Sequence, residues 1–400
     1  MNAAITSSQR RALRALSIAY FVQATGALSV AGSLPAISAA WQLTDAQSAR
    51  LLSIFGLTFA LAAPLVQVMF GHLRRRQLVL TGIGLFGLGA FAFALSPAYG
   101  ALVASRTLMG VGAGFIGPVL VALGSELVHE QQRGRAIGMV LLGVSMASLA
   151  GIPLAAWVAG MWGAKALFAL VGLVSLLSGL NVLLTVPDDS VGSRIRLAEM
   201  AGVLSEGKYL TAFLVVFFIT SGVYSFYSFI APLIRDTYAG GTHAVSAALA
   251  VLGVAGVLGN LWVTRVATRF TSEKLLLTGM TLLIVDTALI ALMPKALGVL
   301  LAALVFWAFA TDLLWPSQQR RIVELSSARH RGIALALTSA FMFGGIGFGS
   351  AVASWVYPVA GFYGLAGMSV AFIVLALVSL QRSEKLRKPV ATAEPCQREA

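Results

Sequence analysis

The stretch PDDSVGSRIRLAEMAGVLSEGK, from Pro187 to Lys208, is the longest polar segment of the chain. It lies near the middle of the 400 residues, with six long apolar runs before it and six after it. Each run is long enough to cross a hydrocarbon core of roughly 30 Å as a helix that rises about 1.5 Å per residue. The stretch therefore predicts a polar linker between two halves that each contain six membrane-spanning helices.

The apolar runs are continuous rather than alternating, which indicates helices and not the shorter strands of a membrane barrel. We expect spans at residues 15–37, 47–70, 77–96, 98–125, 135–159, 164–186, 209–234, 244–268, 274–294, 296–319, 332–356 and 362–381. The predicted fold is an all-α membrane protein with a six-helix bundle at 1–186, a linker at 187–208, a second six-helix bundle at 209–382 and a tail at 383–400.

The composition agrees with a membrane protein. The chain is 58% hydrophobic and 11% charged, whereas soluble domains carry about 25% charged residues. Such an excess of apolar residues implies a second apolar solvent, the lipid bilayer. The net charge of +13 comes from short basic clusters between apolar runs, which is the pattern of membrane topology and not of a nucleic-acid partner.

The basic residues also predict the orientation. Of the 28 lysines and arginines, 23 lie on one set of alternate connecting segments and four on the other, and Arg106 lies inside a span. By the positive-inside rule, both termini are expected on the cytoplasmic side of the membrane. The expected location of the protein is the inner membrane of the cell. The first apolar run starts near Ala15 and is too long for a cleavable signal peptide. The single cysteine, Cys396, excludes a disulfide within the chain.

The two halves resemble each other weakly. The sequence RGRAIG at 133–138 recurs as RHRGIA at 329–334, and Glu126 has a counterpart in Glu324. Such a repeat implies a pseudo-two-fold axis along the membrane normal, with a solute pathway between the halves. Within the linker, residues 195–204 form either a short amphipathic helix on the membrane face or a solvated segment.

Three motifs carry a family resemblance. They are SRTLMGVGAG at 105–114 in the fourth span, GIPLA at 151–155 in the fifth and GVAGVLGN at 253–260 in the eighth. With these motifs the chain resembles the major facilitator superfamily over residues 12–382, and within it the drug:proton antiporters and sugar-efflux permeases. The resemblance implies a secondary-active transporter that functions as a monomer.

The loop between spans two and three departs from that family's pattern. The family's loop usually reads Gly-x-Leu-Ala-Asp-Arg-x-Gly-Arg-Arg, whereas Gly71-His72-Leu73 leads here directly into three arginines, without the acid. The resemblance implies a cytoplasmic gate formed by Gly71, Arg74, Arg75, Glu126, Arg133 and Arg135. Either Glu126 replaces the missing acid in this gate, or the gate is weak; the sequence leaves both alternatives open.

Three charged residues lie inside spans, where each costs about 2.5–3.5 kcal/mol. Arg106 is either a cation of the solute cavity or a structural arginine bonded to backbone carbonyls. Asp312 is either a carboxylate that binds and releases a proton or a partner of Arg320. For Asp286, a polar packing contact between helices is the favoured interpretation, and a role in proton coupling is the alternative. Span one has no acid, so the coupling ion is a hypothesis.

In the family, spans one, four, seven and ten line the central cavity. Span seven carries hydroxyl groups at Ser221, Tyr224, Ser225 and Ser228, spaced to share one helix face. The predicted solute cavity contains Gln23, Arg106, Ser221, Tyr224, Ser225, Trp307 and Asp312. Hydroxyls and aromatic rings suit a small solute that is partly polar and partly apolar; ordinary helix packing is the alternative for each residue.

Small residues in the spans predict close helix contacts. Gly110 and Gly114 stand four residues apart, as do Gly345 and Gly349. Gly151 precedes Pro153, which is expected to kink the fifth span.

Signatures of other functions are missing from the sequence. Two glycine patterns of the dinucleotide-binding type, at 82–87 and 112–117, lie within apolar spans and not after a strand. No Walker, zinc-protease or hydrolase motif occurs, and the four histidines are scattered. We therefore expect no enzyme, cofactor or metal. The first hypothesis is an efflux permease that exchanges a drug-like or metabolite solute for protons. An uptake symporter, a facilitator and a membrane sensor without transport are the alternatives.

Overall fold

The computed structural model describes residues 5–192, 196–266, 269–326 and 330–386, and nearly all of these are helical. Ten continuous helical stretches are long and apolar enough to cross a membrane. Two of them, Glu130–Thr185 and Gly332–Leu386, have 56 and 55 residues, about twice what one crossing needs. Each contains one glycine with a left-handed φ, Gly163 at 86° and Gly361 at 56°. The breaks at these glycines divide the two stretches, and the twelve-helix fold class is confirmed.

The first half contains α1 (Ser7–Trp41), α2 (Asp45–Phe70), α3 (Arg75–Ala94), α4 (Tyr99–Glu126), α5 (Arg133–Met146), a π-helical turn (Ala147–Gly151) and α6 (Ile152–Thr185). The linker contains α7 (Leu197–Ser205). The second half contains α8 (Gly207–Tyr227), α9 (Ile230–Tyr238), α10 (Thr242–Val266), α11 (Ser272–Leu292), α12 (Leu297–Leu325) and α13 (Arg331–Leu386). Together α8 and α9 make the predicted seventh span, interrupted at Ser228 and Phe229.

Some helices are longer than the apolar runs that predict them. α1 has 35 residues and begins at Ser7, because Thr6 and Gln9 form a capping box with reciprocal bonds of 3.2 and 2.9 Å. At about 1.5 Å per residue it measures roughly 52 Å, so its first turns project beyond a hydrocarbon core. Apolar content marks the membrane-embedded part, whereas the cap marks where the helix starts.

The linker contains a short helix, α7, and not only a solvated segment. Met200 and Val203 of α7 are buried in a cluster with Tyr209 and Ile322 of the second half. Arg194, Ile195, Arg329 and the tail from residue 387, which includes Cys396, lie outside the described residues.

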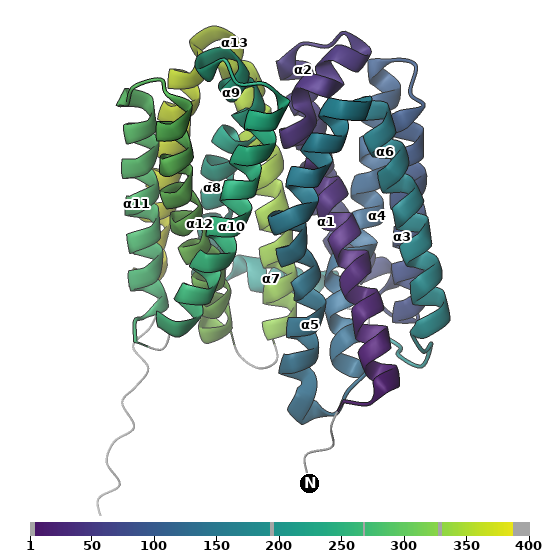
Figure 1. The fold of residues 1–400 in the computed structure, drawn as a ribbon. Coiled ribbons are helices and arrows are strands. Elements are labelled where there is room, and N and C mark those ends of the chain that lie inside the picture. The colour runs from purple at the N-terminus through teal and green to yellow at the C-terminus, as the bar shows by residue number, and fades with distance from the viewer. Residues whose placement is uncertain (1–4, 193–195, 267–268, 327–329, 387–400) are drawn as a thin grey trace, which may run out of the picture.

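Figure 1 shows the two halves as neighbouring bundles of roughly parallel helices. One large apolar core is built almost entirely from residues 5–186 and a second from residues 215–380. The outer faces carry large exposed apolar side chains, such as Leu177, Leu180 and Leu184 on α6 at 55%, 51% and 74% exposure. Such surfaces are stable against lipid and not against water.

α1 begins and α13 ends at the same end of the molecule (Figure 1). We call this end proximal, and the end with the Trp41–Asp45 turn, Gly163 and Gly361 distal. Between these ends the halves touch closely, and two of the contacts involve backbone on both sides. A methyl group at Gly56 of α2 would lie 2.8 Å from the backbone nitrogen of Gly347 of α13, and one at Gly253 of α10 would lie 2.8 Å from Leu149 Cα. Both contacts therefore depend on the absence of a side chain.

Candidate functional site

Arg106 of α4 is completely buried in the first half. Its guanidinium donates to the carbonyl of Leu51 in α2 at 3.2 Å and to those of Gly26 and Ala27 in α1 at 3.2 and 2.9 Å. The charge also lies 4.7 Å from the centre of the Phe55 ring, within range for a cation–π contact. This arrangement ties α4 to α1 and α2 of its own half, so the contacts are those of a structural arginine. A role in solute binding stays a prediction.

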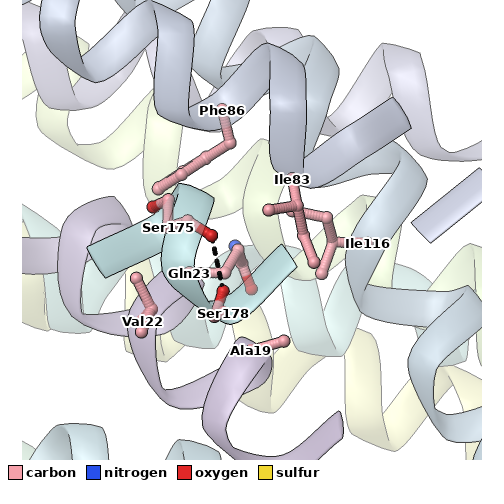
Figure 2. Close-up of a pocket in the computed structure, with 8 residues that line it drawn as sticks. All are labelled: Ala19, Val22, Gln23, Ile83, Phe86, Ile116, Ser175 and Ser178. Atoms are coloured by element: carbon pink, nitrogen blue, oxygen red, sulfur yellow. Dashed lines mark hydrogen bonds between the residues drawn. The ribbon is translucent and has the colours of Figure 1, made fainter. Parts of the chain in front are cut away.

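Gln23 of α1 points into the first half and away from the second. Only 4% of its surface is exposed, and Figure 2 shows it beside Ser175 and Ser178 of α6. These serines donate within their own helix, to Val171 and Ser175 carbonyls at 2.7 Å each. The space between the residues of Figure 2 is too small to admit a water molecule. Gln23 is therefore packed inside a bundle in this conformation, and its place in a solute cavity stays a prediction.

The predicted hydroxyl stripe of span seven divides into two parts. Ser221, Ser225 and Ser228 are buried. Ser221 donates to the Gly345 carbonyl at 3.2 Å, and Ser228 bonds to Ser350 at 2.6 Å, both on α13; Ser225 donates to Gly222 in its own helix. Ser221 and Ser228 therefore contribute to the packing of α8 against α13 in this conformation, and a place for Ser221 and Ser225 in a solute cavity stays a prediction.

Aromatic residues of the second half face the first half instead. Tyr224 and Tyr227 are half-buried and contact the apolar cores of both halves. Their rings meet edge to face at 5.4 Å, and Tyr227 stacks on Trp307 of α12 at 6.2 Å and 13°. The Trp307 side chain is 5% exposed, and its indole N–H has no partner in the structure. We call Tyr224, Tyr227 and Trp307 the aromatic cluster.

Tyr227 was not among the predicted cavity residues. It lies off the hydroxyl stripe, but it stands three residues after Tyr224, a spacing that places both rings on one helix face. That spacing is the signal that could have found it. The aromatic cluster thus combines apolar ring faces with a buried indole N–H that has no partner within the described residues.

Asp312 of α12 is half-buried against two glycines of α10. A methyl group at Gly256 would come within 2.8 Å of its Oδ2 atom, and one at Gly259 within 3.2 Å of its Cβ. For the alternative in which Asp312 pairs with Arg320, the structure gives a different ion pair: the Arg320 guanidinium lies 2.6 Å from Glu324, one turn further along the same helix. The two glycines leave a niche that the carboxylate fills.

Asp286 of α11 is 7% exposed, and its Oδ2 has no hydrogen-bond partner in the structure. The neighbouring Thr287 hydroxyl is likewise buried and unpartnered. The expected polar packing contact is thus not found at this oxygen. Asp286 and Asp312 are two carboxylates inside the membrane-spanning helices of the second half.

At the proximal end, four of the predicted gate residues come together with the linker. Arg75 lies 2.9 Å from Glu126, which also accepts a hydrogen bond from Ser190 of the linker. The turn that starts at Gly71 pairs with the linker backbone, through Arg75 N to Ser190 O at 2.9 Å and Gly192 N to Leu73 O at 3.2 Å. The remaining two, Arg133 and Arg135, lie on the exposed start of α5, where Arg133 approaches Glu130 at 3.8 Å.

Asp188 is a proximal residue that sequence reasoning missed. Its carboxylate lies 2.9 Å from Arg74, in the loop that lacks the acid of the related family. The signal was the Asp-Asp pair directly after span six, a span that ends at the same membrane face as this loop. The carboxylate partners of the arginine loop therefore come from the linker and from α4.

The glycines predicted for packing lie at helix contacts. Methyl groups at Gly110 and Gly114 would meet the α2 backbone at 3.0 Å, at Phe55 O and Ala63 N respectively. Gly345 and Gly349 lie against Phe217 and Ser221 of α8. Gly151 packs on Thr25 of α1 at the end of the π-helical turn, two residues before Pro153. A π turn is one of the recognised causes of a local change in helix direction.

Comparisons with known proteins agree with this architecture. The family model "Major Facilitator Superfamily" matches residues 16–298 and 212–396. The uncharacterized MFS-type transporter YbcL of Bacillus subtilis (strain 168) is 25% identical over 327 residues, 82% of this chain and 84% of YbcL. The inner membrane transport protein YdhP of Escherichia coli (strain K12) is 24% identical over 344 residues, 85% of this chain and 86% of YdhP.

Solved structures show the same fold. A bacterial homologue of the human lysosomal transporter Spinster, in an inward-facing and occupied conformation, has a TM-score of 0.70 and 16% identity, covering 96% of this chain and 97% of that one. A POT family transporter in complex with a thioalcohol-conjugated peptide has a TM-score of 0.75 and 12% identity, covering 94% and 97%. With the family model matched along nearly the whole chain, this multi-pass membrane protein belongs to the major facilitator superfamily and is a membrane transporter.

Proposed function

We propose that this transporter is an efflux permease of the drug:proton antiporter and sugar-efflux branch, which exchanges a small, partly apolar solute for protons. The observation that carries the proposal is the Asp312 carboxylate, held inside a spanning helix against Gly256 with no ion-pair partner in the described residues. Placing a carboxylate in a span costs free energy, so a carboxylate found there favours a functional role. Binding and release of a proton is the function for which a carboxylate is suited.

The direction and the branch of the family rest on the sequence. The GIPLA motif at 151–155 and the GVAGVLGN motif at 253–260 resemble those of efflux members. The alternation of 23 basic residues against four favours cytoplasmic termini in an inner membrane. On this proposal the proximal end faces the cytoplasm, the bundles span residues 1–186 and 209–382, and the protein functions as a monomer.

The solute class follows from the aromatic cluster. Tyr224, Tyr227 and Trp307 offer ring faces, hydroxyl groups and one unpaired indole donor. The three side chains carry no charged group. Such a surface suits a solute with an aromatic or other flat apolar body and a hydrogen-bond acceptor at its edge.

Flux measurements test the exchange. A solute is first identified from a panel of drug-like and sugar-like compounds, because a ligand that binds the folded state raises the melting temperature. In proteoliposomes with an acidic lumen, an antiporter accumulates this solute as protons leave. Accumulation only with an acidic exterior would instead show a symporter. Equilibration of the solute across the membrane, without accumulation under either pH gradient, would show a facilitator. Absence of flux for every stabilising compound would favour a sensor.

Asp312→Asn is expected to abolish accumulation driven by a pH gradient while solute–solute exchange persists. The amide is nearly isosteric with the carboxylate and fills the niche beside Gly256, but it cannot bind and release a proton at physiological pH. The matched control is Asp189→Asn, which changes an exposed carboxylate of the linker. Gradient-driven accumulation at the parental rate in the Asp312 variant would contradict proton coupling through this residue.

Trp307→Phe is expected to weaken solute binding by roughly three- to tenfold, which corresponds to one neutral hydrogen bond of about 1 kcal/mol. Phenylalanine keeps an aromatic face toward Tyr227 but removes the unpaired N–H. The dissociation constant, read from thermal shifts against solute concentration, is the measurement. Trp315→Phe on the same helix is the control, and equal affinity in both variants would show that the indole N–H does not contact the solute.

A further inference from the structure

Charged groups are scarce at the distal end, and three of them meet there. Within the distal turns and the helix ends that flank them, all of which are described, the carboxylates are Asp45 and Asp236. Arg235 contacts both, with Nη2 2.6 Å from Asp45 Oδ2 and Nε 2.6 Å from Asp236 Oδ1. Asp45 begins α2 in the first half, whereas Arg235 and Asp236 end α9 in the second. The ion pair of Arg235 with Asp45 therefore joins the two halves.

The helix ends at which Asp45 and Arg235 lie favour the charge that each residue carries. Asp45 is in the first turn of α2, where the positive end of the helix dipole favours a carboxylate, and Arg235 is in the last turn of α9, where the negative end favours a cation. Ser38 of α1 donates to Asp45 at 3.0 Å and holds that side chain. The pair is thus assembled from groups that are already positioned before they meet.

α13 completes the arrangement. The Tyr357 hydroxyl donates to Asp236 at 3.1 Å, and its ring packs on Phe229 at 4.5 Å. Arg50 of α2 donates to Ser354 of α13 at 3.2 Å. Beneath these polar contacts lies a small apolar layer to which both halves contribute: Leu34, Ala49, Phe229, Ala353 and Leu365. The distal end is therefore closed by polar bonds above an apolar seal.

Three ion pairs of the proximal end differ in this respect. Arg75 with Glu126 lies within the first half, Arg320 with Glu324 within the second, and Arg74 with Asp188 joins the first half to the linker. Separating the halves at the proximal end leaves these three pairs intact. Separating them at the distal end requires that Arg235 leave Asp45.

We propose that Asp45, Arg235, Asp236 and Tyr357 form a distal latch, which holds the halves together at this end and opens when solute passes. Asp236 lowers the free energy that is needed to open the latch. It belongs to the same helix as Arg235 and remains the partner of that arginine when Asp45 moves away. Arg235 is 42% exposed, so water also solvates its charge during release. A half-exposed pair of this kind is weak enough to act as a switch and not as a permanent clamp.

The test measures accessibility and not transport, so its outcome is independent of the proposed exchange mechanism. Cys396→Ser removes the only cysteine, and Leu28→Cys then places one thiol in α1 where the side chain contacts both cores. A membrane-impermeant maleimide is added to right-side-out or inverted vesicles. The labelling rate from each side reports how often that end is open.

Asp45→Asn and Arg235→Gln are each expected to raise labelling from the distal side by roughly fivefold and to lower it from the proximal side. These opposite changes separate a shifted conformational balance from loosened folding, which would raise both rates. The exchange Asp45→Arg with Arg235→Asp restores an ion pair between the halves and is expected to return both rates toward the parental values.

Lys295→Gln is the matched control. Lys295 is a distal cation of the second half that lies 5.3 Å from the ring centres of Phe362 and Tyr363, within its own half. Its substitution is expected to leave both rates unchanged. Unchanged rates in Asp45→Asn and Arg235→Gln, or an equal rise in Lys295→Gln, would overturn the latch.

Discussion

Arg106→Ala is expected to destabilise the purified transporter by about 3–5 kcal/mol, the upper range for removing a large buried side chain. The substitution leaves the carbonyls of Gly26, Ala27 and Leu51 without their donor in a region closed to water. It also leaves an empty space beside the Phe55 ring. For a chain of this length the loss corresponds to a melting temperature lower by roughly 5 °C, measurable by thermal unfolding in detergent.

Two further variants separate the causes. Arg106→Met refills most of the volume without a donor, and Arg106→Lys keeps the charge but presents its donors from one point, which cannot reach carbonyls on both α1 and α2 as the planar guanidinium does. We expect both to fall between the parent and Arg106→Ala. Arg133→Ala, at an exposed arginine of α5, is the control and should change stability by less than about 0.5 kcal/mol.

An unchanged melting temperature in Arg106→Ala would show that the three carbonyl bonds contribute no stability. Solute affinity, measured on the same variants, tests the prediction that Arg106 binds solute. If Arg106→Lys keeps most of the stability but loses solute binding, the guanidinium contacts solute in another conformation of the cycle.

Gly349→Ala is expected to destabilise the second half by about 1–3 kcal/mol, as overpacking does in a filled interior. The added methyl group would lie 2.7 Å from Ser221 Cα in α8, where the atoms in contact are backbone and cannot rotate away. α13 would have to move away from α8, which would stretch the bond from Ser221 to the Gly345 carbonyl. Thermal unfolding and the yield of folded protein are the measurements.

Gly367→Ala gives a control on the same helix with the opposite sign. Nothing lies within 4 Å of a methyl group at Gly367, so the substitution adds helix propensity without a clash. It is expected to stabilise by roughly 0.5–1 kcal/mol. If both variants were stabilised, the contact between α13 and α8 would be loose and not close-packed.

The distal latch and the glycine contacts between the halves have complementary roles in this picture. Gly56 with Gly347, and Gly253 with Leu149, bring the backbones of opposite halves together between the two ends of the molecule. Contacts at that depth change least when two bundles rock, whereas the bond from Arg235 to Asp45 at the distal end changes most. The residues that hold the halves together and the residues that separate when the distal end opens are therefore different.

The sequence by itself determined the fold class, an all-α membrane protein with twelve spanning helices. A span needs about twenty apolar residues in a row, because each backbone polar group in lipid must be bonded within its own helix. That requirement is local, and the runs on either side of Pro187–Lys208 display it directly. The family resemblance, and not the apolar pattern, placed Glu126 and Arg75 in one predicted gate, and the structure brings these two side chains to 2.9 Å.

Only the tertiary structure decided which way each side chain points within the bundle. A helix that is apolar on all sides has no face marked for its neighbours, so the pattern did not show that Gln23 turns toward α3 and α6 or that the serines of α8 turn toward α13. It likewise did not show Tyr227 beside Trp307, Asp188 beside Arg74 or Asp45 beside Arg235. These pairs join residues 80 to 190 positions apart along the chain, and close packing of whole helices, not local sequence, brings them together.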